Sequence, residues 1–226
     1  MARRRRISPA GFPLHVIQRG NNRSNCFLSE TDFIAYVKWL NVYAKKFNIH
    51  IHAWVLMTNH VHLLCTPQED NRGVSAMMQS IGRMYVRRFN AKYERTGTLW
   101  EGRFRSCVVD SEKYLMTVSR YIELNPVRAG LVKHPAKYKW SSYHRNARGV
   151  HTSLCTEHPI YTSLGTDPEA RQKSYSALFQ DELSNKDLGK LITEATIYLE
   201  CWMSVAKIKQ FIAEEESRKA FFSEYK

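Results

Sequence analysis

The alternation of hydrophobic and polar positions predicts a chain that runs strand, helix, strand, strand, helix, strand, helix. Four segments have a strand pattern: Leu14–Gln18, Ile49–Met57, His60–Thr66 and Phe104–Val109. The second and third are separated by Thr58 and Asn59 alone, which predicts a hairpin with a two-residue turn. We therefore expect an α+β fold, a ferredoxin-like antiparallel sheet with packed helices.

Hydrophobic positions three and four residues apart predict the helices. Ser29 and Asp32 form a capping-box pattern that opens the first helix, whose apolar stripe is Phe33, Val37, Leu40, Ala44 and Phe47. The second helix follows Gly73, and its inward positions are Val74, Met77, Ile81, Met84, Tyr85 and Phe89. The third begins at Ser111 with Asp110 as its cap, and its apolar positions are Tyr114, Leu115, Val118, Tyr121 and Ile122.

The pattern weakens after Tyr143. Residues 146–152 are polar and indicate a linker, residues 158–179 indicate a short helical segment, and the last forty residues look helical with an acidic run at Glu214–Glu216. We expect one domain at residues 1–145, then a linker and helical C-terminal appendage at residues 146–226. The appendage either packs on the core, helps the chain form a homodimer, or is a simple helical cap.

Charge indicates a polyanionic partner. The chain has 34 Lys and Arg against 21 Asp and Glu, a net charge of +13, which favours nucleic acid through phosphate contacts. Residues 1–149 hold 25 basic and 9 acidic side chains, so the DNA-facing surface should belong to this part. The expected DNA contacts are Arg3, Arg4, Arg5, Arg6, Arg19, Arg23, Arg83, Arg87, Arg103 and Arg105. Trp100 could stack on an unpaired base or be a core aromatic.

No hydrophobic run is long enough to cross a bilayer, and the arginines at 3–6 lack the apolar stretch of a signal peptide. Five widely spaced cysteines without a C-x-x-C pair indicate neither a disulfide framework nor a zinc site. We expect no membrane partner and a cytoplasmic protein that associates with the nucleoid.

His60-Val61-His62 is the most informative motif. On a strand both imidazoles point to one face, so the pair either holds a divalent metal with a third ligand from elsewhere or belongs to an ordinary amphipathic strand. Asn125 is the best third ligand, because it lies one helical turn after Tyr121, whose phenol can act as a nucleophile on phosphorus. Pro126 disfavours helical geometry at Asn125, so this ligand is expected at a fraying helix end.

Two alternative residue sets compete with these. His50-Ile51-His52 has the same spacing as His60-Val61-His62. If the Thr58-Asn59 turn pairs Val55 with His62, strand alternation places His50 and His52 on the opposite face, so the two pairs cannot share one metal. Spacing alone does not choose between the pairs. Tyr114 lies two turns before Tyr121, but its neighbour four residues on is Val118, which cannot bind a metal. We therefore favour Tyr121.

At these residues the chain resembles the HUH single-tyrosine transposases, and within them the REP-associated tyrosine transposases. The matching segments, in the family's order, are Phe12 to Arg23, His52 to Leu64, Leu99 to Ser106, Tyr121 to Val132 and Trp140 to Tyr143. The chain departs from the family at Thr58, which replaces a proline, and at Cys201-Trp202-Met203. The resemblance selects His60 and His62, which leaves His50 and His52 as structural. It implies Mg²⁺ or Mn²⁺ on His60, His62 and Asn125, and attack by Tyr121 on single-stranded or REP-like hairpin DNA to give a 5′-phosphotyrosine.

The sequence thus favours a metal-dependent DNA endonuclease and strand transferase. Two alternatives stay open at this point. One is a non-catalytic, DNA-binding regulatory protein that keeps the fold and the basic surface. The other is a nuclease in which metal-bound water replaces the tyrosine as nucleophile.

Overall fold

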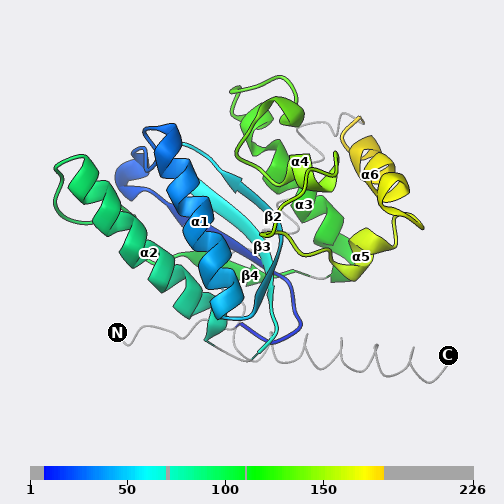
Figure 1. Cartoon of the computed structure of the whole chain (residues 1–226), viewed down its shortest axis with the longest axis horizontal. Helices are drawn as coiled ribbons and strands as arrows, with labels where there is room; N and C mark the ends of the chain where they lie inside the picture. Colours follow the sequence, from blue (N-terminus) through cyan, green and yellow to red (C-terminus); the bar gives the residue numbers. More distant parts are fainter. Residues whose placement is uncertain (1–7, 70–71, 110, 181–226) are drawn as a thin grey trace.

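The protein, seen in a computed structural model that describes residues 8–69, 72–109 and 111–180, contains a four-stranded antiparallel sheet (Figure 1). The elements that build it are β1 Leu14–Arg19, α1 Glu30–Lys46, β2 Ile49–Leu56, β3 His60–Pro67, α2 Gly73–Lys92 and β4 Arg105–Val108. The strand order is β2-β3-β1-β4. Two strand-helix-strand units interleaved in this order make the ferredoxin-like fold, so the predicted fold class is confirmed.

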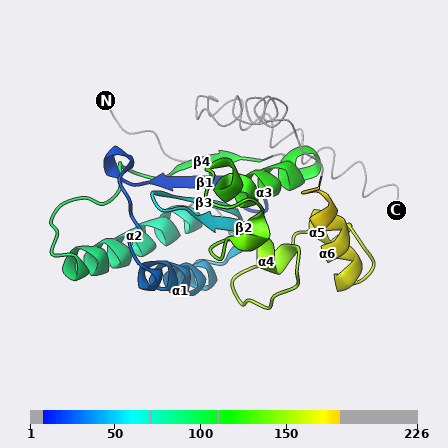
Figure 2. The same ribbon diagram turned by 90° about the horizontal axis from the view of Figure 1, so that it is seen from above.

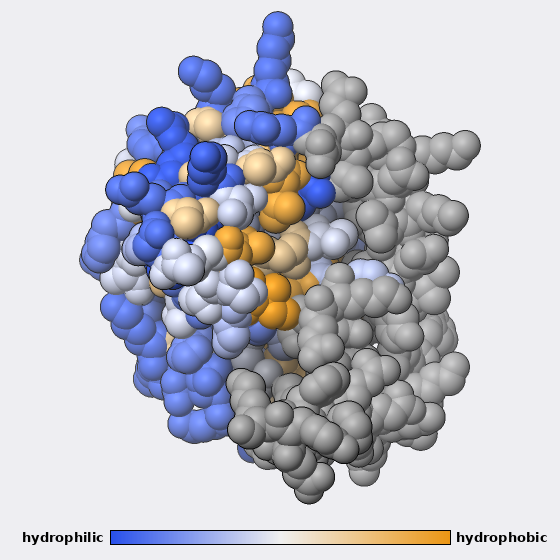
Figure 3. Space-filling view, turned by 90° about the vertical axis from the view of Figure 1, so that its right-hand side faces the viewer, coloured by the Kyte–Doolittle hydropathy of each residue, from blue (hydrophilic) through white to orange (hydrophobic). Residues whose placement is uncertain are grey.

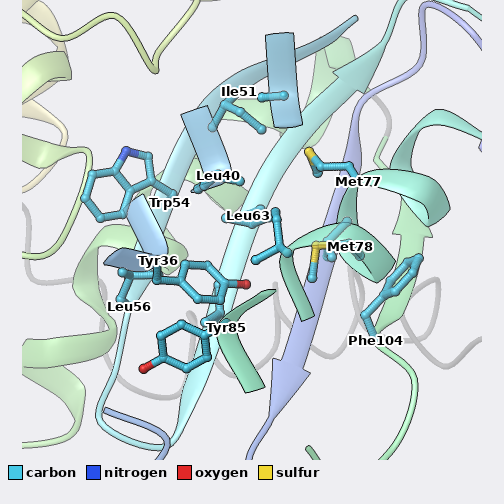
Figure 4. Packing of buried hydrophobic residues seen from close by; sticks show 14 of the residues in the cluster. Tyr36, Leu40, Ile51, Trp54, Leu56, Leu63, Met77, Met78, Tyr85 and Phe104 are labelled. Atoms are coloured by element: carbon cyan, nitrogen blue, oxygen red, sulfur yellow. The ribbon is translucent and has the colours of Figure 1, made fainter. Parts of the chain in front are cut away.

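Helices α1 and α2 cover one face of the sheet (Figure 2). The predicted capping box at the start of α1 is present: the Asp32 carboxylate accepts hydrogen bonds of 3.0 Å from the backbone N–H groups of Leu28 and Ser29. Lys92 at the end of α2 binds the same carboxylate at 2.8 Å, which ties the two helices together. Between helices and sheet lies the main hydrophobic core, which includes Tyr36, Leu40, Ile51, Leu63, Met77, Met78 and Tyr85 (Figure 4).

Helix α3, Ser111–Arg128, packs on the opposite face of the sheet. Its buried side chains Leu115, Val118 and Ile122 contact a second cluster that contains Ala53, Val55 and Leu64. Alternation along β3 therefore sends Val61 and Leu63 toward α1 and α2, and sends His60, His62 and Leu64 toward α3. The histidine pair and the predicted tyrosine helix share one side of the sheet.

Pro126 does not end α3, which corrects the expectation that Asn125 lies at a fraying helix end. The helix continues to Arg128 with Pro126 inside it. Proline has no N–H for the carbonyl of Ile122 four residues earlier. The amide Nδ2 of Asn125 donates a substitute hydrogen bond to the Ile122 carbonyl at 3.4 Å and also donates to the Tyr121 carbonyl at 2.8 Å. The Asn125 side chain is therefore fixed against its own helix.

The chain after α3 covers the outer edge of β2. Short elements follow at η2 Pro135–Lys137, α4 Tyr143–Asn146, α5 Pro159–Thr162 and α6 Pro168–Ala177. Three backbone hydrogen bonds join this segment to β2: Leu56 N–H to the Trp140 carbonyl at 2.9 Å, Ser142 N–H to the Trp54 carbonyl at 2.9 Å, and Thr156 N–H to the Ile51 carbonyl at 2.7 Å.

Residues expected to form a linker begin inside α4, where Asn146 is buried and donates to the His52 carbonyl at 3.1 Å. The domain boundary after residue 145 stays a prediction. The short helical segment predicted at residues 158–179 is present as α5 and α6. On the side of α6, the described surface is largely hydrophilic and carries a strip of hydrophobic residues (Figure 3). The expected cap at Asp110, the residues Cys201-Trp202-Met203 and the acidic run at Glu214–Glu216 lie outside the described residues.

Within the part of the chain that the structure describes, none of the helices combines the length and hydrophobicity needed to span a membrane.

Candidate active site

The two predicted metal ligands lie at the turn end of β3, beside the end of β1. His60 is paired with Arg19 and His62 with Ile17 across the β1–β3 ladder. The predicted turn is present, with the Met57 N–H bonded to the His60 carbonyl at 2.8 Å across Thr58 and Asn59. The two imidazole rings lie 4.9 Å apart, centroid to centroid, and nearly perpendicular. This spacing lets both rings point at one position.

The ring of His60 is oriented by Asn59. Its Nδ1 lies 2.6 Å from Asn59 Oδ1, while Asn59 Nδ2 donates to the Arg23 carbonyl at 3.0 Å. An amide oxygen only accepts, so the proton of the neutral imidazole is on Nδ1 and the lone pair is on Nε2. Metal-binding histidines in proteins typically have such an outer partner. Asn59 also connects this ring to the loop that carries Arg23.

His62 is held by a third histidine, His15, which the sequence patterns did not single out. The Nδ1 atom of His62 lies 2.8 Å from Nε2 of His15 on β1, and the rings stack at 5.1 Å. Burial lowers the pKa of His15 to about 3 and the pKa of His60 to about 4, with the charge of Arg19 also lowering the latter. Burial likewise holds the pKa of His62 well below its usual range. All three rings are therefore neutral at pH 7, the form that binds metals.

Asn125 reaches this pair from α3. Its side chain faces His60 and can accept a hydrogen bond from the protonated form of that ring, which acts to raise the pKa of His60. Because Nδ2 is used on the α3 carbonyls, Oδ1 is the atom available as a ligand. Among the described residues, no three His, Cys, Asp or Glu side chains form a cluster that could hold a metal. Two imidazoles and an amide oxygen are a donor set that divalent metals accept in proteins, so the side chains of His60, His62 and Asn125 fit a metal.

Tyr121 lies against the histidines. Its ring is edge-on to His62 at 5.7 Å and to His15 at 5.9 Å. The guanidinium of Arg128, two turns further along α3, lies 4.9 Å from the centre of the Tyr121 ring. The position four residues after Tyr114 is Val118, which is buried in the core. The geometry thus places Tyr121 next to the two histidines and the amide of Asn125, whereas the residue one turn after Tyr114 is apolar and buried.

The expectation that His50 lies on the opposite face of the sheet from His62 is wrong, although both competing histidines lie apart from His60. A β-bulge between Ile51 and Ala53 shifts the register, so His50 is paired with Thr66 on the face that also holds His62. Thr66 is four residues beyond His62, which is about 13 Å along a strand. His52 uses both ring nitrogens, at 2.9 Å to the Thr156 carbonyl and 2.8 Å to Thr66 Oγ1. Neither can join His60 at one metal.

The predicted basic residues fall into two groups. Arg19, Arg23, Arg83, Arg87, Arg103 and Arg105 are exposed. Arg3, Arg4, Arg5 and Arg6 lie outside the described residues.

Trp100 corrects the stacking hypothesis. It is only 6% exposed and packs in the core beside Tyr85, at 5.9 Å, and Tyr36, at 6.3 Å. An indole inside the core offers no face to a base.

His15, Asn59 and Arg128 were not predicted as site residues. A signal existed for His15, because alternation along β1 puts His15, Ile17 and Arg19 on one face, the face on which His62 lies. Arg128 had a weaker signal, since it is seven residues from Tyr121 on the same helix. Asn59 had none beyond its place next to His60.

Comparisons with known proteins show the family to which the chain belongs. Residues 10–125 match the family described as "Transposase IS200 like", so the chain belongs to the IS200-like transposase family. The REP-associated tyrosine transposase of Escherichia coli (strain K12) is 28% identical over 102 residues, which are 45% of this chain. The chain spans 59% of that relative's length.

A solved structure of a REP-associated tyrosine transposase bound to a REP hairpin superposes with a TM-score of 0.53 and 24% identity. The match covers 70% of this chain and 93% of the other. This likeness shows the shared fold. The predicted resemblance to single-tyrosine transposases is confirmed.

Proposed function

We propose that the protein is a metal-dependent endonuclease and strand transferase that acts on single-stranded or hairpin DNA through a 5′-phosphotyrosine. One observation carries the proposal: the Tyr121 ring lies 5.7 Å from the His62 ring, beside His60 and Asn125. A nucleophile and three metal-binding side chains therefore converge from β3 and α3. The family to which the chain belongs supports the same reaction class.

His60, His62 and Asn125 would hold the divalent metal. When bound there, it would polarise a phosphoryl oxygen and offset the negative charge that develops on it. Imidazole suits many transition metals, so the preference for Mg²⁺ or Mn²⁺ rests on the resemblance to the family.

Tyr121 would carry out the covalent step. As its phenol oxygen bonds to phosphorus, the bond from phosphorus to the 3′-oxygen breaks and the electron pair stays on that oxygen. The phenol loses its proton and the 3′-oxygen gains one, so the products are a 3′-hydroxyl and a 5′-phosphotyrosine. This ester conserves the energy of the broken bond, so the strand can be rejoined without a nucleotide cofactor. Arg128 beside the phenol and Arg19 beside His60 place positive charge where the phosphate would lie.

The proposed substrate is single-stranded DNA with a hairpin, similar to a REP element. The net charge of +13 and the exposed arginines at 19, 23, 83, 87, 103 and 105 support contact with a polyanion. Both relatives are named for REP elements, and one of them is bound to a REP hairpin, which supports the hairpin in particular. Homodimer formation stays a prediction.

The experiment uses a labelled single-stranded hairpin oligonucleotide, Mg²⁺ and a denaturing gel. The wild-type protein and Tyr114→Phe should form a covalent protein–DNA adduct, and Tyr121→Phe should form none while binding DNA nearly as well. Cleavage that persists in Tyr121→Phe would support water as nucleophile. Binding without cleavage in the wild type would support a regulatory protein.

A further inference from the structure

We infer that His15 is a positioning residue that selects the tautomer of His62 in which Nε2 is free to bind the metal. This inference rests on the metal site of the proposed function. His15 holds the ring of His62 from behind and takes no part at phosphorus itself.

The two rings form a closely packed, buried pair. His15 is 1% exposed and His62 is 3% exposed. His15 lies on a strand that is hydrogen-bonded on both sides, opposite Leu64 of β3 and Cys107 of β4. Its backbone position is therefore set by the sheet. The stacked rings, with an interplanar angle of 20°, leave His62 Nδ1 facing His15 Nε2 at 2.8 Å.

A hydrogen bond between two neutral imidazoles needs one N–H and one lone pair, so only two arrangements are possible. In the first, His62 Nδ1–H donates to His15 Nε2, and His62 Nε2 keeps the lone pair that a metal requires. In the second, His15 Nε2–H donates to His62 Nδ1, and His62 Nε2 carries a proton and cannot bind. Metal binding thus requires the first arrangement, with the proton of His15 on Nδ1.

Packing alone does not explain why a histidine occupies position 15, because its Nδ1 atom gains nothing from burial. Within the described residues this nitrogen is buried without a hydrogen-bond partner. An unpaired buried polar atom destabilises a fold, so an apolar side chain would suit this place better on stability alone. The hydrogen bond to His62 is an interaction that a polar side chain at this position makes and an apolar one cannot.

The test combines metal affinity with a direct view of the protons. Titration calorimetry with Mn²⁺ compares the wild type with His15→Leu, His15→Gln and Val16→Ala. Leu removes the acceptor, whereas the Oε1 atom of Gln can occupy the place of Nε2 and accept. Val16 is a buried β1 residue on the opposite face, so its truncation reports a general loss of packing. In parallel, ¹⁵N NMR of histidine-labelled wild-type protein with Mg²⁺ assigns the tautomers.

We expect His15→Leu to bind Mn²⁺ about 10–100-fold more weakly, as loss of an outer partner does elsewhere, with His15→Gln and Val16→Ala near wild type. The metal-bound wild type should show His62 and His15 both protonated on Nδ1. The inference is wrong, and the proposed metal site is unaffected, if His15→Leu binds Mn²⁺ as tightly as the wild type. The same holds if His15 carries a proton on Nε2 in the metal-bound protein. A wild type that binds no Mn²⁺ overturns the metal site and the inference together. The NMR result stands even if His15→Leu does not fold.

Discussion

The phenol of Tyr175 on α6 donates a hydrogen bond of 3.0 Å to the carboxylate of Glu123 on α3. Glu123 is fully buried and also accepts from Ser142 Oγ at 2.5 Å and Asn146 Nδ2 at 2.9 Å. Burial raises the pKa of Glu123 to about 7, against the effect of these three donors. Because Glu123 lies between Tyr121 and Asn125 in sequence, the segment after residue 141 fixes the stretch of α3 that carries both.

Removing the Tyr175 hydroxyl should destabilise the fold. At pH 8, where Glu123 is ionised, Tyr175→Phe should lower the free energy of unfolding by about 1.5–3 kcal/mol, because a donor to a buried charge is lost. Urea denaturation measures this. Tyr36→Phe is the matched control, since the Tyr36 hydroxyl is buried with no partner among the described residues; this variant should be as stable as the wild type or more so. Equal losses in both variants would contradict the role of the hydrogen bond.

Calorimetry can distinguish the proposed metal ligands from the competing histidines. His60→Ala should reduce Mn²⁺ affinity more than about 100-fold, because even outer partners of metal ligands are worth about 10–100-fold. His50→Ala is the control, since His50 is paired with Thr66, four residues beyond His62 along β3. This variant should bind Mn²⁺ as tightly as the wild type does. Unchanged binding in His60→Ala would show that the site lies elsewhere.

Acid should destabilise the protein partly through His52. Burial lowers the pKa of His52 to about 4, from 6.5, so between these values the unfolded chain binds a proton that the folded protein does not. Stability is therefore lost as the pH falls from about 6.5 to 4, by about 3 kcal/mol for this residue. In urea titrations between pH 8 and pH 4, the free energy of unfolding of His52→Gln should fall by about 3 kcal/mol less than that of the wild type. Above pH 7 the two curves should run parallel; parallel curves over the whole range would refute the assignment.

Recognition of DNA should depend in part on the four arginines at 3–6. Each phosphate contact adds about −0.7 to the slope of log K against log salt on single strands. Replacing Arg3–Arg6 by Ala should weaken binding and flatten that slope by about 0.7 for each arginine in contact, while cleavage at saturating DNA persists. The quadruple Arg→Lys variant keeps the charge and should keep the slope. If the Ala variant binds as before, the basic face lies elsewhere, with the Arg83 and Arg87 side of α2 the next to test.

Much of this arrangement followed from residue patterns, because alternation and helical spacing report directly which side chains share a face. The hairpin turn placed Val55 opposite His62, as predicted. Alternation failed where the chain departs from regular geometry: the bulge near His52 moved His50 to the other face. Pattern reasoning also failed where a side chain replaces a backbone hydrogen bond, as Asn125 does for Pro126. His15 was not predicted because a single histidine in an apolar strand has the pattern of a core residue.

Residues 140–156 also protect the edge of strand β2. An uncovered strand edge presents free N–H and C=O groups to which another chain can add a strand. Here the groups of β2 at Ile51, Trp54 and Leu56 are bonded to residues 140–156. A chain cut soon after α3 would keep every proposed ligand and the nucleophile, yet it would expose this edge and invite aggregation. Two copies could join their sheets at β2 only after residues 140–156 had detached from that strand.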